Sequence, residues 1–256
     1  MEFRGKAFAL AEVLITLGII GVVAALTLPS LIQKSTEKET VVSLKKFYSE
    51  SSQAFSLAVE KDGEPDQWST IEIGDGEGSD EFIAHMKPYF KILKDCSYDQ
   101  AGCSSEGKYK TLAGMERVTF ADASSKHSKF VLANGMLVTF FLNSKECKFK
   151  SEEMGDTPQL KNICGGLAVD INGHKKPNVY GRDYFIFYVT KYGVIPSGSS
   201  SENKETSNYP FSVQCKRTNT SSYYSGHGCA AWVIYNENMD YLHCDDLSWE
   251  GKHKCK

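Results

Sequence analysis

The sequence lacks a strong excess of charge and lacks the short motifs of common enzymes. Its 256 residues carry 29 Lys and Arg against 32 Asp and Glu, a net charge of −3. That balance is too mild to predict a nucleic-acid partner. Neither G-x-S-x-G, H-E-x-x-H nor a phosphate-binding loop occurs, and the six histidines are scattered. No motif therefore supports an enzyme. A membrane-anchored enzyme remains as an alternative functional class.

Long apolar runs are scarce as well, with one exception near the N-terminus. From Phe8 to Ile32 the chain has 25 residues and one charge, Glu12. An apolar helix of that length spans the roughly 30 Å hydrocarbon core of a bilayer. A cleaved signal peptide needs a small-residue site after the run, which here ends in Thr27-Leu28-Pro29-Ser30. A plain signal anchor leaves Glu12 unexplained, because a carboxylate in an apolar span costs about 2.5–3.5 kcal/mol on insertion scales.

The segment Phe8-Ala-Leu-Ala-Glu12-Val-Leu-Ile resembles the N-terminal segment of type IV prepilins and type II secretion pseudopilins. In that family a prepilin peptidase cuts on the cytoplasmic side of the apolar run and methylates the new N-terminus, usually Phe. A glutamate lies fifth from the new end. The resemblance implies cleavage between Ala7 and Phe8, a methylated Phe8 and Glu12 in fifth place. Ala7 departs from the usual Gly before the cut, so we expect slower processing.

The resemblance also implies a domain plan and a place in the cell. Residues 1–7 would be a cytoplasmic leader, residues 8–32 the membrane or filament-core helix, residues 33–62 its amphipathic continuation and residues 63–256 a globular domain. The protein would cross the inner membrane once, with its C-terminal domain outside the cytoplasm. Inner-membrane assembly machinery would then move it into an extracytoplasmic helical filament.

Filament partners would be other copies or related pilins, with Glu12 pairing the Phe8 amine of a neighbour. In a bilayer neither charge finds water, so each needs the other. A filament-building pilin, a minor pilin and a pseudopilin of type II secretion or DNA uptake remain open. An anchored extracytoplasmic binding domain is a further alternative.

The residues after the apolar run indicate that its helix continues. Pro29 removes one helical hydrogen bond and predicts a kink or a local opening. Gly21 and Ala25 have the small-xxx-small spacing that lets membrane helices approach. Beyond Pro29 an apolar stripe predicts a helix to about Lys61, ended by Asp62-Gly63 and Pro65; its members are Leu44, Phe47, Tyr48, Ser51, Phe55 and Ala58.

The remainder predicts an antiparallel sheet. Residues 128–133, Asn134-Gly135 and residues 136–142 indicate a hairpin with a type I′ turn. Residues 166–171, 184–190 and 230–235 indicate further strands. Residues 62–80 indicate a loop, with Ser79 as N-cap of a short following helix. A long helix followed by antiparallel strands gives an α+β, pilin-like fold.

Eight cysteines follow the apolar run, and their even number predicts disulfides in an oxidising compartment. The sequence does not fix their connectivity; neighbour pairing is the simplest hypothesis. A zinc site using His243-Cys244 and His253-x-Cys255 is the alternative. The neighbour pairs are Cys96–Cys103, Cys147–Cys164, Cys215–Cys229 and Cys244–Cys255.

A loop between two predicted strands collects oxygen-bearing side chains: Asp170, Asn172, Asn178 and Asp183. Calcium prefers six to eight oxygen ligands. Major pseudopilins carry a calcium loop in this general region, so the resemblance implies calcium as a cofactor. The loop is not an EF-hand, because Gly173 comes too early and no glutamate closes it. The alternative is an Asx-stabilised turn without an ion.

Overall fold

The structure is a computed structural model that describes residues 10–71, 76–105, 107–117, 127–149, 157–199, 201, 210–220 and 222–255. The chain divides into two compact units, Met1–Glu39 and Thr40–Lys256. Ala7 and Phe8, the predicted cleavage site, lie outside the described residues.

Helix α1 runs from Leu10 to Asp62 and belongs to both units. In the first unit its apolar side chains are exposed, from Leu10 at 80% to Ile32 at 63%. Pro29 lies inside the helix, which is continuous on both sides of it. A kink at Pro29 stays a prediction.

In the second unit α1 buries one face: Thr40, Val41, Leu44, Phe47, Ser51, Ala54, Phe55 and Ala58. The predicted stripe is therefore confirmed, with Tyr48 half-buried at its margin. The helix ends where Gly63 takes a φ of +83° and its N–H bonds to Val59 O at 3.0 Å. This left-handed residue after the last turn is the favoured glycine cap.

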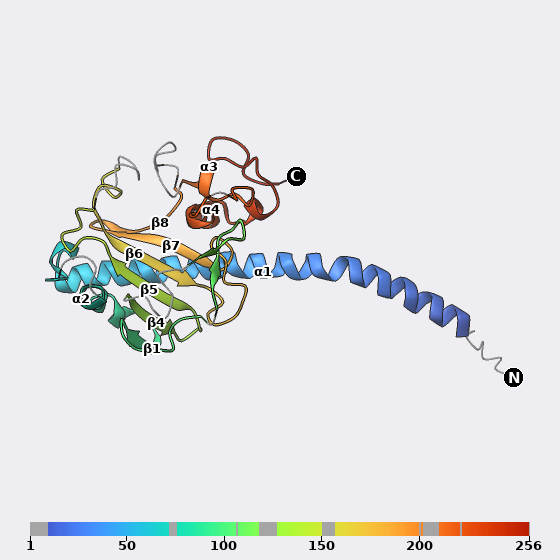
Figure 1. The fold of residues 1–256 in the computed structure, drawn as a ribbon, viewed down its shortest axis with the longest axis horizontal. Helices are drawn as coiled ribbons and strands as arrows, with labels where there is room; N and C mark the ends of the chain where they lie inside the picture. The colour runs from blue at the N-terminus through green and yellow to red at the C-terminus, as the bar shows by residue number, and fades with distance from the viewer. Residues whose placement is uncertain are drawn as a thin grey trace, which may run out of the picture. The chain divides into compact units, whose positions relative to one another are not determined.

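A six-stranded antiparallel sheet forms the centre of the second unit (Figure 1), in the order β1-β4-β5-β6-β7-β8. Its strands are β1 (Ile92–Ser97), β4 (Ser128–Leu132), β5 (Leu137–Leu142), β6 (Ile163–Asp170), β7 (Tyr184–Thr190) and β8 (Gly193–Pro196). A separate two-stranded ribbon pairs β2 (Tyr109–Lys110) with β3 (Glu116–Arg117). The α+β prediction is confirmed.

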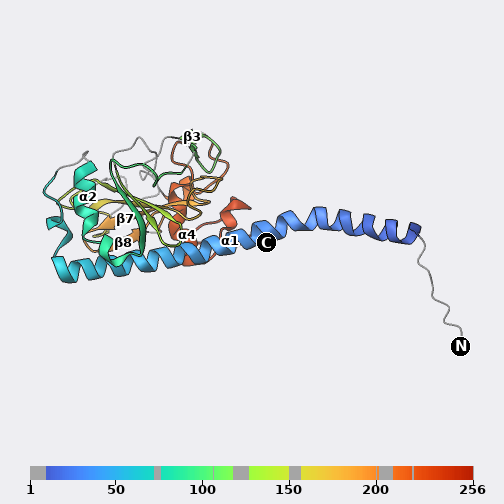
Figure 2. The same ribbon diagram turned by 90° about the horizontal axis from the view of Figure 1, so that it is seen from below.

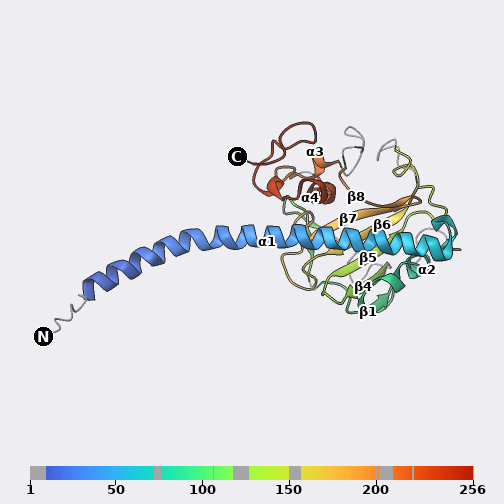
Figure 3. The same cartoon turned by 180° about the vertical axis from the view of Figure 1, so that it is seen from behind.

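The second-unit part of α1 crosses one face of this sheet (Figure 3). Phe47 of α1 meets Phe187 of β7 edge-on, with ring centroids 5.5 Å apart. Side chains alternate along β7, so Phe185 and Phe187 join the core under α1 while Tyr184 and Ile186 join a second cluster. The strand predicted over residues 184–190 is confirmed as β7.

Short helices complete the second unit: α2 (Gly76–Ala84) and α4 (Ala230–Asn236), both labelled in Figure 2, and α3 (Phe211–Gln214), labelled in Figure 1. Single 3-10 turns occur at Pro65–Gln67, Lys87–Tyr89, His227–Cys229 and Asp240–Leu242.

The predicted loop over residues 62–80 is wrong at its end, because α2 begins at Gly76. A Cβ at Gly76 would lie 2.4 Å from the Tyr98 ring, so glycine permits close packing here. The Ser79 hydroxyl does not cap the helix; it accepts a hydrogen bond from Leu142 N at 3.1 Å. Glycines that indicate a loop in the sequence are thus packing residues of a helix.

Residues 230–235 were predicted as a strand and instead form most of α4. Residues 230–234 are all buried, and a fully buried short apolar run has no periodicity to separate helix from strand. Ala230 and Ala231 favour a helix by propensity. The apolarity of this run suits either a strand or a helix, and the strand prediction is wrong because the run forms a helix.

The predicted β4–β5 hairpin is confirmed, but its type I′ turn is wrong. Gly135 N donates to Leu132 O at 2.8 Å, and Gly135 has a φ of +88° while Asn134 does not have positive φ. A type I′ turn needs positive φ at both central residues. The loop is a type I turn followed by a left-handed glycine, and Asn134 Oδ1 accepts from Met136 N at 3.2 Å.

Four disulfides follow the neighbour pairing, which is therefore confirmed: Cys96–Cys103, Cys147–Cys164, Cys215–Cys229 and Cys244–Cys255. The last bridge uses both cysteines of the zinc alternative, which is accordingly wrong.

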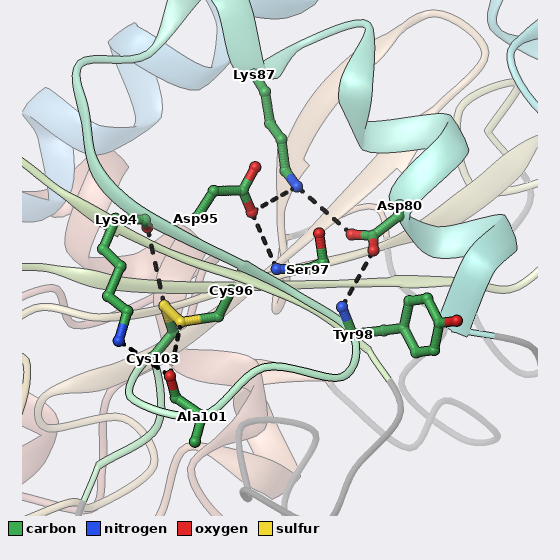
Figure 4. The surroundings of a disulfide bond; sticks show 9 residues. All are labelled: Asp80, Lys87, Lys94, Asp95, Cys96, Ser97, Tyr98, Ala101 and Cys103. Carbon is green, nitrogen blue, oxygen red and sulfur yellow. Dashed lines mark hydrogen bonds and ion pairs between the residues drawn. A yellow bond between two sulfur atoms is a disulfide. The ribbon is translucent and has the colours of Figure 1, made fainter.

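The first bridge closes a loop at the end of β1 (Figure 4). Lys87 Nζ lies 2.8 Å from Asp95 and 3.4 Å from Asp80. The same two carboxylates accept from Ser97 N at 3.0 Å and Tyr98 N at 3.1 Å. Lys87 and the Tyr98 N–H thus tie the end of β1 to Asp80 of α2, and the disulfide ties it to the loop at Cys103.

Candidate functional site

The apolar segment is the first candidate site. Among the residues that the structure describes, α1 is the one helix whose length and composition would let it cross a membrane. Glu12 lies in its first turn. A negative charge there is favoured by the positive end of the helix dipole.

No contact within the described chain requires glycine at two positions of this segment. A Cβ added at Gly18 or Gly21 would meet no described atom within 4 Å. Both positions lie on a helix surface where small residues permit close approach of another helix.

The second candidate is the loop between β6 and β7, which Asp183 organises. Its carboxylate accepts from Asn178 N at 2.8 Å, from Asn172 Nδ2 at 2.9 Å and from Val179 N. Asn178 has a φ of +56°, a left-handed conformation that Asn tolerates. The structure therefore brings Asn172, Asn178 and Asp183 together as an Asx-stabilised loop.

Asp170 ends β6 on the tyrosine side of the sheet. It is fully buried, and its Oδ2 accepts from Tyr109 OH at 2.7 Å. Burial raises the pKa of Asp170 to about 8, and the charge of Asp183 acts in the same direction. Burial also raises the pKa of Asp183. The loop therefore has a buried carboxyl group at each of its two ends.

The donor set offers part of a calcium shell. Asp170 Oδ1 and Asn172 Oδ1 are buried, and neither has a hydrogen-bond partner within the described residues. Calcium would find these two oxygens and the Asp183 carboxylate, fewer than the six to eight ligands it prefers. No group of three or more His, Cys, Asp or Glu that could hold a metal occurs in the described part of the chain. Calcium stays a prediction.

A third cluster surrounds His227, one of the six histidines that are scattered in the sequence. His227 is 1% exposed in the turn His227–Cys229, and its ring stacks on Tyr180 at 4.4 Å. Arg117 Nη1 donates to His227 Nε2, so the ring is neutral. Burial first and the Arg117 charge second hold the pKa of His227 well below its usual range.

Arg117 was missed by the sequence analysis. It lies in the two-residue strand β3, and its neighbours in the cluster are over 60 residues further along the chain. No local spacing could have indicated this cluster.

Comparison with known proteins gives one family. A family model described as "Family of unknown function (DUF6613)" matches residues 30–237. The match begins after most of the apolar segment and includes the whole sheet. No curated protein and no solved structure matches the chain.

Proposed function

The chain belongs to this family of unknown function, and we propose that it is a structural subunit of a type IV pilus-like filament, assembled through its apolar N-terminal helix. The observation that carries the proposal is α1, a single helix of 53 residues that is apolar and exposed at first and later has one buried face. Such a helix suits a protein held first by lipid and then by like helices.

Three further observations support the proposal. Glu12 is the only charge in the apolar run, at the position where the resembling family has its assembly glutamate. Gly18 and Gly21 leave room for a neighbouring helix. The four disulfides suit a domain outside the cytoplasm.

In this proposal a prepilin peptidase cuts after Ala7 and methylates Phe8. The protein waits in the inner membrane until assembly machinery moves it into the filament. A pseudopilin of type II secretion or DNA uptake fits the same observations and is the second candidate.

Mass spectrometry of the unreduced protein from its native membrane tests the proposal. We expect a chain that begins at methylated Phe8 and is eight hydrogens lighter than the reduced form, as four disulfides require. A chain that keeps residues 1–7 would overturn the proposal and leave an anchored extracytoplasmic domain.

A further inference from the structure

Arg117 is a buried cation enclosed by aromatic rings. Only 7% of the residue is exposed. Its guanidinium carbon lies 4.0 Å from the ring centre of Tyr223, 5.0 Å from that of Tyr180 and 5.1 Å from that of Tyr224. Cation–π contact favours this placement but does not neutralise the charge.

The hydrogen bonds of Arg117 use one nitrogen only. Nη1 donates to Tyr223 O at 2.6 Å and to His227 Nε2. Nε is buried and makes no hydrogen bond, while Nη2 makes none and is not fully buried. No ion pair joins Arg117 to any carboxylate of the described residues. A buried charge is normally paired, because desolvation is otherwise uncompensated.

The two unused nitrogens lie on the same edge of the guanidinium. Their N–H bonds are parallel and match the two oxygens of a carboxylate. Tyr223 is 48% exposed, so the cluster reaches the surface at this ring, and Nη2 is the nitrogen of the unused edge that is not fully buried. We propose that the Nε–Nη2 edge of Arg117 binds the carboxylate group of a small ligand, beside the Tyr223 ring.

A carboxylate of the same chain is the competing source. Asp122 follows Arg117 by five positions and lies outside the described residues. The experiment must therefore distinguish a ligand from this side chain.

The test is a titration of the full chain in detergent micelles, followed by NMR of the arginine Nε–H signals. Acetate and glucuronate are the carboxylate probes, and chloride and glucose are the matched controls at equal ionic strength. We expect a saturable shift of the Arg117 signal with both carboxylates and with neither control. The conservative Arg117→Lys keeps the charge but not the edge, so binding of the two carboxylates, measured for this variant by isothermal titration calorimetry, should weaken about tenfold or more. Arg182→Lys, at an exposed arginine, should leave it unchanged.

Two results would overturn the inference. One is an Arg117 signal that does not respond to carboxylates, which the wild-type titration alone decides even where Arg117→Lys does not fold. The other is binding that requires Asp122→Asn, since the edge would then belong to the chain's own carboxylate.

Discussion

Glu12 is a single carboxylate in an apolar helix, and its charge restricts where that helix can lie. Glu12 shares its 25-residue run with no other charged side chain. Transfer of that charge into hydrocarbon is unfavourable, so the residue gains most where a cation meets it. In the proposed filament that cation is the amine of a neighbouring Phe8.

We predict that Glu12→Ala inserts into the membrane normally but does not enter filaments. The measurement compares membrane and sheared-filament fractions by immunoblotting. Glu39→Ala, an exposed glutamate of α1 beyond the apolar run, serves as the control and should assemble. Normal filaments from Glu12→Ala would contradict the assigned role.

Phe47 is a residue of α1 that packs directly on the sheet. It is fully buried against Phe187, whereas Leu57 of the same helix is 44% exposed. We predict that Phe47→Ala lowers the free energy of unfolding by about 3–5 kcal/mol, because a cavity replaces a packed ring. Leu57→Ala should change it by less than about 0.5 kcal/mol. Denaturant melts of the full chain in detergent measure the unfolding free energies of both variants. Equal losses of stability would contradict the assignment of Phe47 to the core.

His227 gives the pH dependence of stability a definite sign. Its pKa is lowered in the folded state, so the unfolded chain binds more protons below about pH 6.5. The free energy of unfolding therefore decreases as the pH is lowered below about 6.5. Asp170, whose pKa is raised to about 8, acts in the opposite direction and stabilises the fold as the pH falls through 8.

The two contributions are separated by comparing the wild type with His227→Gln at each pH. We predict that the difference in unfolding free energy between the two proteins shrinks from pH 7.5 to pH 5, because only the wild type must keep this ring neutral. A difference that is constant with pH would contradict the buried neutral histidine.

At the scale of elements, the loop from Asp170 to Asp183 is where an ion would act. If calcium binds there, a chelator should lower the melting temperature of the wild type, and Asp183→Ala should remove that sensitivity. Asp183→Ala should also be less stable by about 1–3 kcal/mol without calcium, because three N–H donors lose their acceptor. Thermal melts with and without chelator measure both, and the exposed Asp245→Ala is the control. A wild-type melt that ignores the chelator favours the ion-free loop.

Elements with a clear period could be predicted from the sequence. The stripe of α1 follows the helical repeat, and β4, β5 and β7 contain β-branched and aromatic residues next to turn signals. β1 was missed because it is mostly exposed and is interrupted by register shifts. The first turn of α2 was mistaken for a loop because its glycines serve packing, a tertiary reason that no local preference contains.

The candidate sites show the same limit. Asp170, Asn172, Asn178 and Asp183 lie close in sequence, so their loop could be found there. The cluster around Arg117 joins β3 to the turn at His227, 110 residues away, and only the fold assembles it.

At the scale of the whole molecule, the disulfides are confined to residues 96–255, and none reaches α1. Loss of a native disulfide costs about 2–5 kcal/mol, while a typical domain has only about 5–15 kcal/mol of stability. We predict that reduction of all four unfolds the second unit and leaves the apolar helix in its membrane or micelle. Near-UV circular dichroism before and after reduction measures the loss of tertiary structure. An unchanged spectrum would show that the core alone sustains the fold.

The exposed apolar surface of α1 has a consequence for the direction of the proposed assembly. Acyl chains and neighbouring leucine-rich helices solvate such a surface almost equally well, so exchanging one for the other releases little hydrophobic free energy. A subunit of this kind would leave the bilayer with little change in free energy, and could return to it as readily. The bias toward the filament must then come from the few polar contacts in the span or from work done by a motor. Retraction would be the same path in reverse, with the membrane serving as a reservoir of reusable subunits.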